Sequence, residues 1–391
     1  MDFAEFLAPM PVESFIAGHF GKRPAQIRGE SPRSGLLTMA RLEELLSVRP
    51  HWTEDNLKLI LNSRPILGEH FIEDAQPGRA ARRADPAKIE LFLRMGASLV
   101  GDHIEDIDHN VRDAAAMLSE QFAGTAGANV YCSFKGIRAF NSHCDLHEVF
   151  AVQLEGEKVW QIYENRADSP VETIQGPNAQ AIIDQAKGRV MMTVHMQPGD
   201  LLYIPRGYFH DALADTAASL HLTFGIAPLD GRYIFKLLEQ MATRDARFRA
   251  YLPDGRSDPA LLRSHLAALA DELGALVRSP LFETELTNRQ RALVMRAEGV
   301  DLQKREKLDH YAATGTGAQV ERRPDGAILR HPRGEEPLGP LGEPVEWVLG
   351  QQAFSGQQLR ARFQWLTAGE GRRIIELVTR LGLFTPYEPQ V

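Results

Sequence analysis

The sequence has very little cysteine and no long apolar segment. Cys132 and Cys144 are the two cysteines among 391 residues, which is typical of a protein that folds without disulfides in a reducing compartment. No stretch approaches the roughly 18 apolar residues that a membrane-spanning helix needs. The first residues, Met1 to Phe6, include no basic region followed by an apolar one, so we expect no secretory signal peptide. These absences predict a cytoplasmic location and no membrane partner.

The sequence also lacks an excess of positive charge. It contains 44 Lys and Arg against 52 Asp and Glu, a net charge of −8, which argues against a general nucleic-acid or membrane-surface binder. The composition is 43% apolar and 25% charged, as in an ordinary soluble globular protein. A length of 391 residues gives room for a sizeable core and two or three domains.

Two short motifs contain the residue types of a metal site. His143 and Asp145 are two positions apart, and side chains at i and i+2 of a strand point to the same face. His210 lies far downstream, after Leu201–Ile204, which predicts a buried strand, and Pro205-Arg206-Gly207, which predicts a turn. Two histidines and one carboxylate form the facial triad of non-haem Fe(II) proteins, which leaves positions open for a co-substrate and O₂.

The segment after the first motif predicts a hairpin. Apolar residues alternate over 148–155, Glu155-Gly156 supplies a turn, and a second strand follows over 158–163. This hairpin would place Lys158 on the strand next to the one that carries the first two metal ligands. A lysine directed into a protein interior is costly unless it meets an anion, so we predict that Lys158 binds an acidic ligand.

Taken in order, these motifs resemble the JmjC-type Fe(II)/2-oxoglutarate oxygenases, specifically the ribosomal oxygenase (cupin-4) family. The matching segments are Asn129-Val-Tyr131, His143-x-Asp145, Gln153-Leu-Glu-Gly-Glu-Lys158-x-Trp160, Pro198-Gly-Asp-Leu-Leu-Tyr-Ile-Pro-Arg-Gly-x-x-His210 and Ser219-x-His221-x-Thr223. The resemblance implies an α+β fold built on a double-stranded β-helix of the jelly-roll, cupin or JmjC type. It also implies N-terminal helices, a helical dimerisation region and a C-terminal winged-helix-like domain.

The resemblance also assigns roles to site residues. It implies Fe(II) at His143, Asp145 and His210, and 2-oxoglutarate anchored by Lys158 through its distal carboxylate. Asn129 and Tyr131 correspond to positions that face co-substrate or substrate, although a tyrosine on a barrel strand is often a core residue with a satisfied hydroxyl.

Further residues are candidates for supporting or substrate contacts. His221 is the best candidate for an orienting partner of a metal-bound histidine, and Thr223 shares its motif. His147 could replace a ligand, but its position favours a pocket residue, and it departs from the aliphatic or acidic residue expected in the family. Ser133 and Arg138 complete the set of candidates.

The chain is expected to contain three regions: a catalytic region at 1–228 with a helical N-terminal preface, a helical region at 229–282, and a C-terminal domain at 283–391. Asp258-Pro259 predicts a helix start, and a leucine stripe follows at Leu262, Leu266, Leu269, Leu273 and Leu276. The stripe must be buried, either against the chain's own barrel or, as the resemblance implies, in a homodimer.

The C-terminal domain is expected to contain a hairpin over 318–329 and helices at 287–298, 345–349, 357–363 and 372–381. From Ala318 to Val391 it contains nine Arg, no Lys and nine acidic residues. A charge-balanced domain has no basic footprint, so a protein-contact or stabilising role is favoured over nucleic-acid binding.

Together these features predict a dioxygenase that hydroxylates a protein side chain, with Arg or His of a ribosomal protein as outcomes known in the family. Alternatives within the same chemistry are demethylation of N-methyl groups and hydroxylation of another protein, a peptide natural product or a small molecule. A non-catalytic metal-binding cupin and a DNA-binding regulator are alternatives from other classes. The complete triad with Lys158 argues against the first, and the charge balance argues against the second.

Overall fold

The computed structural model describes residues 1–29, 31–47, 51–61, 64–73, 83–134, 141–214, 218–295, 310–315, 317–323 and 326–387. The chain divides into two compact units, 1–228 and 229–391, and each is described here by itself. No helix of these described ranges is both long and apolar enough to cross a membrane.

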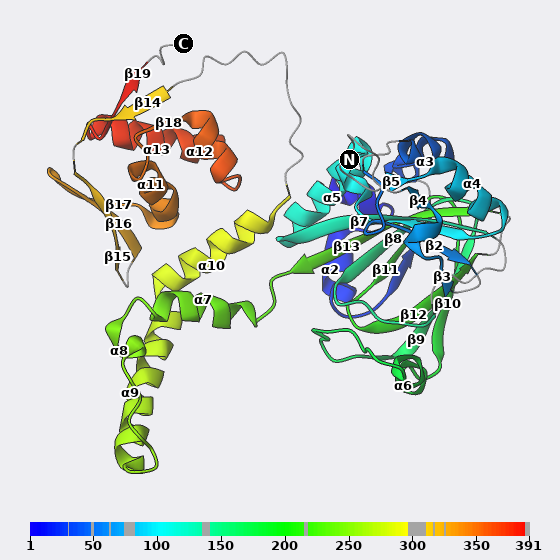
Figure 1. The fold of residues 1–391 in the computed structure, drawn as a ribbon, viewed down its shortest axis with the longest axis horizontal. Helices are drawn as coiled ribbons and strands as arrows, with labels where there is room; N and C mark the ends of the chain where they lie inside the picture. Colours follow the sequence, from blue (N-terminus) through cyan, green and yellow to red (C-terminus); the bar gives the residue numbers. More distant parts are fainter. Residues whose placement is uncertain are drawn as a thin grey trace. The chain divides into compact units, whose positions relative to one another are not determined.

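The first unit is built mainly from β-strands (Figure 1). These strands are β1 (Ala25–Ile27), β2 (Leu57–Leu61), β3 (Arg64–Pro65), β4 (Ile72–Glu73), β5 (Arg83–Ala84), β6 (Ser98–Gly101), β7 (Gly124–Phe134), β8 (Glu148–Glu155), β9 (Lys158–Arg166), β10 (Val190–Met196), β11 (Leu201–Ile204), β12 (Tyr208–Ala214) and β13 (Ala218–Pro228). An eight-stranded sheet has the order β1-β11-β8-β13-β7-β6-β2-β3, and a three-stranded sheet has the order β10-β9-β12.

Its helices are α1 (Phe3–Leu7), α2 (Val12–Gly18), α3 (Met39–Leu46), α4 (Pro86–Arg94), α5 (His109–Phe122) and α6 (Ala179–Ala186), with short 3₁₀ helices η1 (Pro32–Gly35), η2 (Gly68–His70) and η3 (Ile104–Asp106). The N-terminal preface is therefore not purely helical, because β1 and β2 extend the larger sheet. Helix α3 begins after Thr38, whose side chain accepts a hydrogen bond from the Arg41 amide and so caps the helix.

The two sheets pack face to face over an apolar core. One buried cluster combines side chains of β8 and β11 from the larger sheet with side chains of β9 and β10 from the smaller one, namely Val149, Ala151, Leu202, Ile204, Trp160, Ile162, Val194 and Met196. Alternation in β11 explains this, because Leu202 and Ile204 point inward while Tyr203 points to the outer face. There its ring meets Phe15 of α2 with centroids 4.8 Å apart. The two packed sheets agree with the jelly-roll core that the family resemblance implied.

The predicted hairpin between 148–155 and 158–163 is wrong in its pairing, although both strands exist. β8 pairs with β11 and β13 in the larger sheet, whereas β9 pairs with β10 and β12 in the smaller one. The turn at Gly156 (φ +64°) therefore carries the chain from one sheet to the other. Alternation predicts strands but does not reveal the partner of a strand, because pairing depends on distant segments.

The buried guanidinium of Arg33 links the N-terminal segment to the barrel by hydrogen bonds. Arg33 is fully buried, and its guanidinium donates to the carbonyls of Gly199 (2.8 Å), Phe6 (2.7 Å), Ala8 (2.6 Å) and Gly29 (3.0 Å). Burial lowers its pKa to about 10. These four hydrogen bonds satisfy a charge whose burial would otherwise be costly, and they join α1 to the loop before β11.

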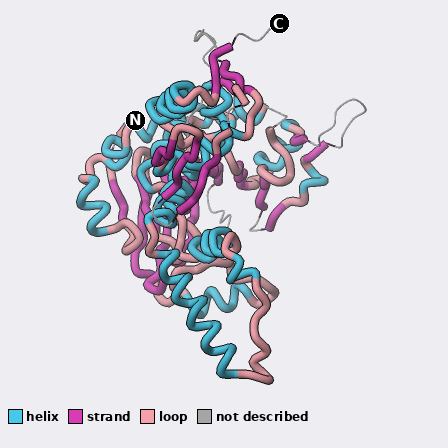
Figure 2. Tube along the Cα trace, turned by 90° about the vertical axis from the view of Figure 1, so that its left-hand side faces the viewer, coloured by secondary structure: helices cyan, strands magenta, loops and turns pink. Residues whose placement is uncertain are grey.

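The second unit begins with four helices, α7 (Tyr233–Ala242), α8 (Ala246–Arg249), α9 (Pro259–Val277) and α10 (Pro280–Leu293). The predicted start of α9 is confirmed, because Asp258 accepts from the Leu261 amide and proline follows at the first helical position. Figure 2 shows α9 as one uninterrupted helix. The expected division between residues 282 and 283 falls inside α10, and the three-domain scheme stays a prediction.

The rest of this unit is a small α+β body. Its elements are β14 (His310–Ala313), β15 (Gln319–Arg323), β16 (Gly326–His331), β17 (Gly334–Pro337), η4 (Gly339–Leu341), α11 (Gly342–Leu349), β18 (Ala353–Ser355), α12 (Gly356–Arg362), α13 (Ala368–Arg380) and β19 (Phe384–Tyr387). The predicted hairpin is confirmed by the pairing of β15 with β16, and its turn residues 324 and 325 lie outside the described residues. Three of the four predicted helices, 345–349, 357–363 and 372–381, correspond to α11, α12 and α13. The fourth, predicted over 287–298, overlaps α10, which begins earlier at Pro280 and ends at Leu293.

Candidate metal centre and co-substrate pocket

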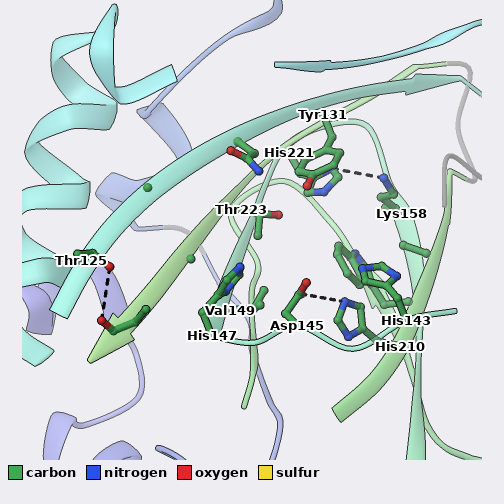
Figure 3. Close-up of a pocket in the computed structure, with 16 residues that line it drawn as sticks. Thr125, Tyr131, His143, Asp145, His147, Val149, Lys158, His210, His221 and Thr223 are labelled. Atoms are coloured by element: carbon green, nitrogen blue, oxygen red, sulfur yellow. Dashed lines mark hydrogen bonds and ion pairs between the residues drawn. The ribbon is translucent and has the colours of Figure 1, made fainter. Parts of the chain in front are cut away.

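The structure brings together the three residues predicted to hold a metal ion. One potential ligand atom each from His143, Asp145 and His210 lies within 4.8 Å of the others, and within the described ranges this is the one His/Cys/Asp/Glu cluster with such spacing. Nε2 of His210 lies 3.5 Å from Oδ2 of Asp145, and the two imidazole centroids are 4.5 Å apart (Figure 3). Two nitrogen donors and one carboxylate on one side of a shared point match a facial triad.

The backbone orients both imidazoles. Nδ1 of His143 lies 2.9 Å from the Asn141 carbonyl, and Nδ1 of His210 lies 3.0 Å from the Tyr208 carbonyl. A carbonyl accepts only from a protonated nitrogen, so each ring carries its proton on Nδ1 and has its lone pair on Nε2. Both histidines are therefore held in the tautomer that coordinates through Nε2.

The expectation that His143 and Asp145 share a regular strand is wrong. Within 141–147 the only ladder contact is an isolated bridge, in which His143 N donates to His210 O (3.0 Å) and His210 N donates to His143 O (2.8 Å). The Asp145 carbonyl accepts from Gly207 N at 2.9 Å. Gly207 belongs to the predicted turn, and its φ of +88° favours glycine. The ligand segment is thus a loop that is tied to the start of β12.

The protonation states at the centre suit a divalent cation. Burial by itself raises the pKa of Asp145, but His210, His143 and His147 nearby lower it below its ordinary value. Burial and the neighbouring His143 lower the pKa of His210 to about 4. At neutral pH the cluster therefore presents an ionised carboxylate and a neutral His210 ring, so no proton needs to leave them before a metal binds.

A cavity of about 310 Å³ extends from the cluster between the two sheets (Figure 3). Its lining comes from alternate positions of β7, β13, β9 and β12, from Val149 of β8 and from the ligand loop. The lining residues are Thr125, Gly127, Asn129, Tyr131, His143, Asp145, His147, Val149, Lys158, Trp160, His210, Ala212, His221, Thr223, Gly225 and Ala227.

Lys158 is a buried cation in this cavity. Its side chain is 4% exposed, and its Nζ lies 3.4 Å from Nδ1 of His221 and 5.9 Å from the ring centroids of both Tyr131 and Trp160. No carboxylate of the described residues forms an ion pair with it. Burial lowers its pKa to about 7. The prediction that Lys158 binds an acidic ligand stays a prediction. The expected position beside the first two metal ligands is wrong, because Lys158 lies on β9, which pairs with β10 and β12.

The other candidate residues divide between the two ends of the cavity. His221 stacks on Tyr131, with ring centroids 4.6 Å apart, and it lies against Lys158. The imidazoles of His143 and His210 have backbone carbonyls, rather than His221, as their orienting partners. Burial, and then Lys158, lower the pKa of His221 well below its usual value, and burial raises the pKa of Tyr131. Asn129 and Thr223 face each other across β7 and β13 and line the cavity.

Ser133 and Arg138 are the two remaining candidates. Ser133 is buried but is absent from the lining, and its hydroxyl has no hydrogen-bond partner within the described part of the chain. Arg138 lies outside the described residues.

The sequence reasoning missed a glycine pair that shapes the far end of the cavity. Gly127 of β7 lies opposite Gly225 of β13, and both face the interior. A Cβ on Gly225 would come within 2.8 Å of Cε1 of His147, so the imidazole occupies space that a side chain would otherwise fill. One glycine in the interior of each of two long strands was the available signal, since glycine inside a strand often marks a close approach. His147 is thereby placed in the cavity wall.

Comparisons with known proteins agree with this arrangement. Residues 101–232 match the family model described as JmjC domain. The chain is 30% identical over 262 residues to Ribosomal oxygenase 1 of Danio rerio, which covers 64% of this chain and 46% of that protein. It is 29% identical over 228 residues to the bifunctional lysine-specific demethylase and histidyl-hydroxylase NO66 of Aedes aegypti, covering 57% of this chain and 34% of that one. The chain thus spans less than half the length of these relatives.

Among solved structures, YcfD, a ribosomal oxygenase from Escherichia coli in complex with cobalt and succinic acid, has the same fold. The two chains superpose with a TM-score of 0.50 at 15% sequence identity, over 97% of this chain and 99% of that one. At this identity the likeness concerns the fold alone.

Proposed function

Because residues 101–232 are a JmjC domain and the chain is related to the ribosomal oxygenases, we propose that it is an Fe(II)- and 2-oxoglutarate-dependent oxygenase. Its substrate would be a side chain of a protein, and the relatives' names favour a ribosomal one. Arginine and histidine are the candidate side chains.

One observation carries this proposal: a buried lysine, which has no carboxylate partner among the described residues, shares a cavity with a His-Asp-His cluster. The donor set fits Fe(II), since three ligand atoms lie within 4.8 Å of one another and cover one side of a shared point. A non-catalytic metal-binding cupin would need the cluster but not a buried ammonium beside it.

Each end of the cavity has a separate task. His143, Asp145 and His210 would hold Fe(II), and Lys158 would bind the distal carboxylate of 2-oxoglutarate. When bound there, the iron with 2-oxoglutarate and O₂ supplies the chemistry that hydroxylates a C–H bond and yields succinate and CO₂. The rings of Tyr131, Trp160 and His221 keep water away from the ammonium, which strengthens its attraction for a carboxylate.

The far end of the cavity would receive the substrate side chain. There His147 packs over the bare backbone of Gly225, and Asn129, Thr223 and His147 offer hydrogen-bonding groups to a substrate side chain. Such positioning contributes to rate by holding the reacting C–H bond close to the metal. Demethylation of an N-methyl group is the second candidate, because the NO66 relative is named for both activities.

Turnover without substrate tests the enzyme class. Anaerobic protein is loaded with Fe(II) and 2-oxoglutarate and then exposed to O₂, and succinate is measured over time. We expect slow succinate formation by the natural chain and none above background by the matched His210→Ala variant. Equal succinate in both samples would overturn the proposal.

We further propose that the helical region forms a homodimer. As a single chain, α9 has no buried residue, and Leu261 and Leu266 are 53% and 48% exposed. Phe235 on α7 is 73% exposed. Apolar side chains repeated along one long helix are best explained by a second copy that covers them.

Light scattering coupled to size exclusion checks the dimer. The natural chain should have twice the mass of one chain at micromolar concentration, and Leu262→Asp/Leu266→Asp should have the mass of one. Ile182→Asp on α6 is the matched control, because Ile182 is also exposed (49%) but lies in the first unit. A natural chain that runs as a monomer would contradict the proposal.

The C-terminal body is proposed to be a winged-helix-like protein-contact module without a nucleic-acid role. Four of its arginines form ion pairs with nearby carboxylates: Arg322 with Glu346 (2.7 Å), Arg323 and Arg330 with Glu335 (2.9 and 3.0 Å), and Arg380 with Glu336 (3.0 Å). Such pairs leave little basic surface for phosphates. The cytoplasm is the proposed location, which fits two cysteines that are both free thiols.

A further inference from the structure

A buried polar cluster lies directly behind the two histidines of the metal centre. Ser142 precedes His143 and Asp211 follows His210, and neighbouring residues of extended chain point to opposite faces. Both side chains therefore face away from the cavity, where they meet Tyr163 of β9. We propose that Ser142, Tyr163, Asp211 and Lys187 form a positioning network that sets the metal affinity of the His143–Asp145–His210 cluster.

The network is centred on a carboxylate. Asp211 is 2% exposed, and its Oδ2 accepts from the hydroxyl of Ser142 (2.7 Å) and from the hydroxyl of Tyr163 (2.7 Å). Tyr163 lies on the same face of the small sheet as Asp211, because Gln161, two residues earlier, is the register partner of Asp211. Two hydroxyl donors on one buried charge make strong, directional hydrogen bonds.

A lysine completes the network and balances its charge. Nζ of Lys187 donates to Oγ of Ser142 at 2.9 Å and lies 4.5 Å from the centroid of the Tyr163 ring. Lys187 follows α6, and it also pairs with Asp184 of that helix at 2.7 Å. The segment between β9 and β10 thus packs on the side of the metal centre that faces away from the cavity, and it places the Lys187 ammonium there.

The ligand loop needs such support because its backbone is weakly tied. The two ladder hydrogen bonds between His143 and His210 and the one from Gly207 N to Asp145 O hold it from the strand side. The Ser142–Asp211 bond is a side-chain connection between the same two segments, one residue away from each histidine. Loss of it would let the two rings move relative to each other, and a metal that needs both would bind less tightly. Outer partners of ligands typically contribute about 10- to 100-fold to metal affinity.

None of the four network residues lines the cavity, so they would act through the histidines rather than on ligand or substrate. The inference rests on the metal site of the proposed function. Binding of Co(II) to the natural chain is therefore measured first, so that failure of the site itself is recognised separately from failure of the network.

The test is a Co(II) titration of the full chain, followed by visible absorption. We expect Ser142→Ala and Asp211→Ala each to raise the Co(II) dissociation constant about 10- to 100-fold and to change the shape of the absorption band. The double variant should resemble Asp211→Ala, because that change already breaks the connection between Ser142 and Asp211. Ser119→Ala is the matched control: it removes another buried hydroxyl of this unit, which donates to the Gly124 carbonyl, and it should leave the dissociation constant unchanged.

Thermal unfolding of each metal-free variant separates positioning from simple stability. A purely structural role would lower the melting temperature yet leave Co(II) affinity and spectrum unchanged at a temperature where the variant is folded, and that result would overturn the inference. If Asp211→Ala does not fold, Tyr163→Phe and Ser142→Ala decide the matter. Natural Co(II) affinity and spectrum in both would overturn it, and weakening in both would support it.

Discussion

Replacement of Lys158 by alanine is expected to weaken 2-oxoglutarate binding roughly 10- to 150-fold. A charge-assisted hydrogen bond in a dry pocket contributes about 1.5–3 kcal/mol, and about 1.4 kcal/mol is a factor of ten. Lys158 is 4% exposed, and among the described residues that line the cavity it is the only Lys or Arg. No second Lys or Arg of that lining would therefore share the task. The measurement is a titration of 2-oxoglutarate into anaerobic Fe(II)-loaded protein, followed by the metal-to-ligand charge-transfer absorption.

Two controls define this result. Metal affinity of Lys158→Ala should stay close to that of the natural chain, because the lysine is not a ligand. Lys158→Arg keeps the charge with a different shape and should restore only part of the affinity. An unchanged midpoint in Lys158→Ala would show that another residue anchors the acid.

The pH dependence of the same equilibrium follows from the lowered pKa of Lys158. Burial lowers this pKa to about 7 in the ligand-free protein, and a bound carboxylate raises it again. Below pH 7 the amine is charged in both states, so pH has no effect through this group. Above pH 7 binding takes up a proton, and affinity should fall roughly tenfold per pH unit until the pKa of the bound state is reached. Calorimetry in two buffers of different ionisation enthalpy measures this proton uptake directly.

Removal of one ligand from the metal cluster is expected to have a still larger effect. His210→Ala should weaken Fe(II) or Co(II) binding by at least about 100-fold, since even outer partners of ligands cost 10- to 100-fold. His147→Ala is the matched control, because this imidazole also lines the cavity but lies outside the cluster. Equilibrium dialysis of metal with each variant, with metal content measured in the protein compartment, gives both constants.

The opposite pattern would reassign the ligands. If His147→Ala abolished metal binding while His210→Ala retained it, the centre would be formed by another set of donors. The His147 imidazole would then have to move away from Gly225, against which it packs in the structure.

Local signals in the sequence predicted much of the fold. The strand at Leu201–Ile204, the turn at Gly207 and the start of α9 at Asp258 each depend on a few neighbouring residues, and all three are found. The metal cluster was also predictable, because its residue types and order are distinctive. The prediction that His210 lies next to Asp145 depended on the resemblance to a known family, because sequence spacing alone does not show that the two residues meet.

The parts that sequence reasoning missed depend on contacts between distant segments. β8 and β9 follow each other with a turn between them, yet they belong to different sheets. The partner of Ser142 is Asp211, 69 residues away, and neither residue belongs to a recognisable motif. The opposition of Gly127 and Gly225 likewise exists only once β7 and β13 pair. Pairing register is set by the whole fold, so single-segment patterns do not contain it.

The register between β9 and β12 has a further consequence for the length of the acid that the cavity accepts. Lys158 stands four residues along β9 from Ile162, which lies opposite His210. At about 3.3 Å per residue, the backbone positions of the ammonium and of the metal ligand are separated by about 13 Å along rigid, hydrogen-bonded strands. The register of the sheet therefore sets the length of a molecule that must reach both the ammonium and the metal. Oxaloacetate, one methylene shorter than 2-oxoglutarate, and 2-oxoadipate, one methylene longer, would each satisfy one end at the expense of the other, and both should compete poorly for the cavity.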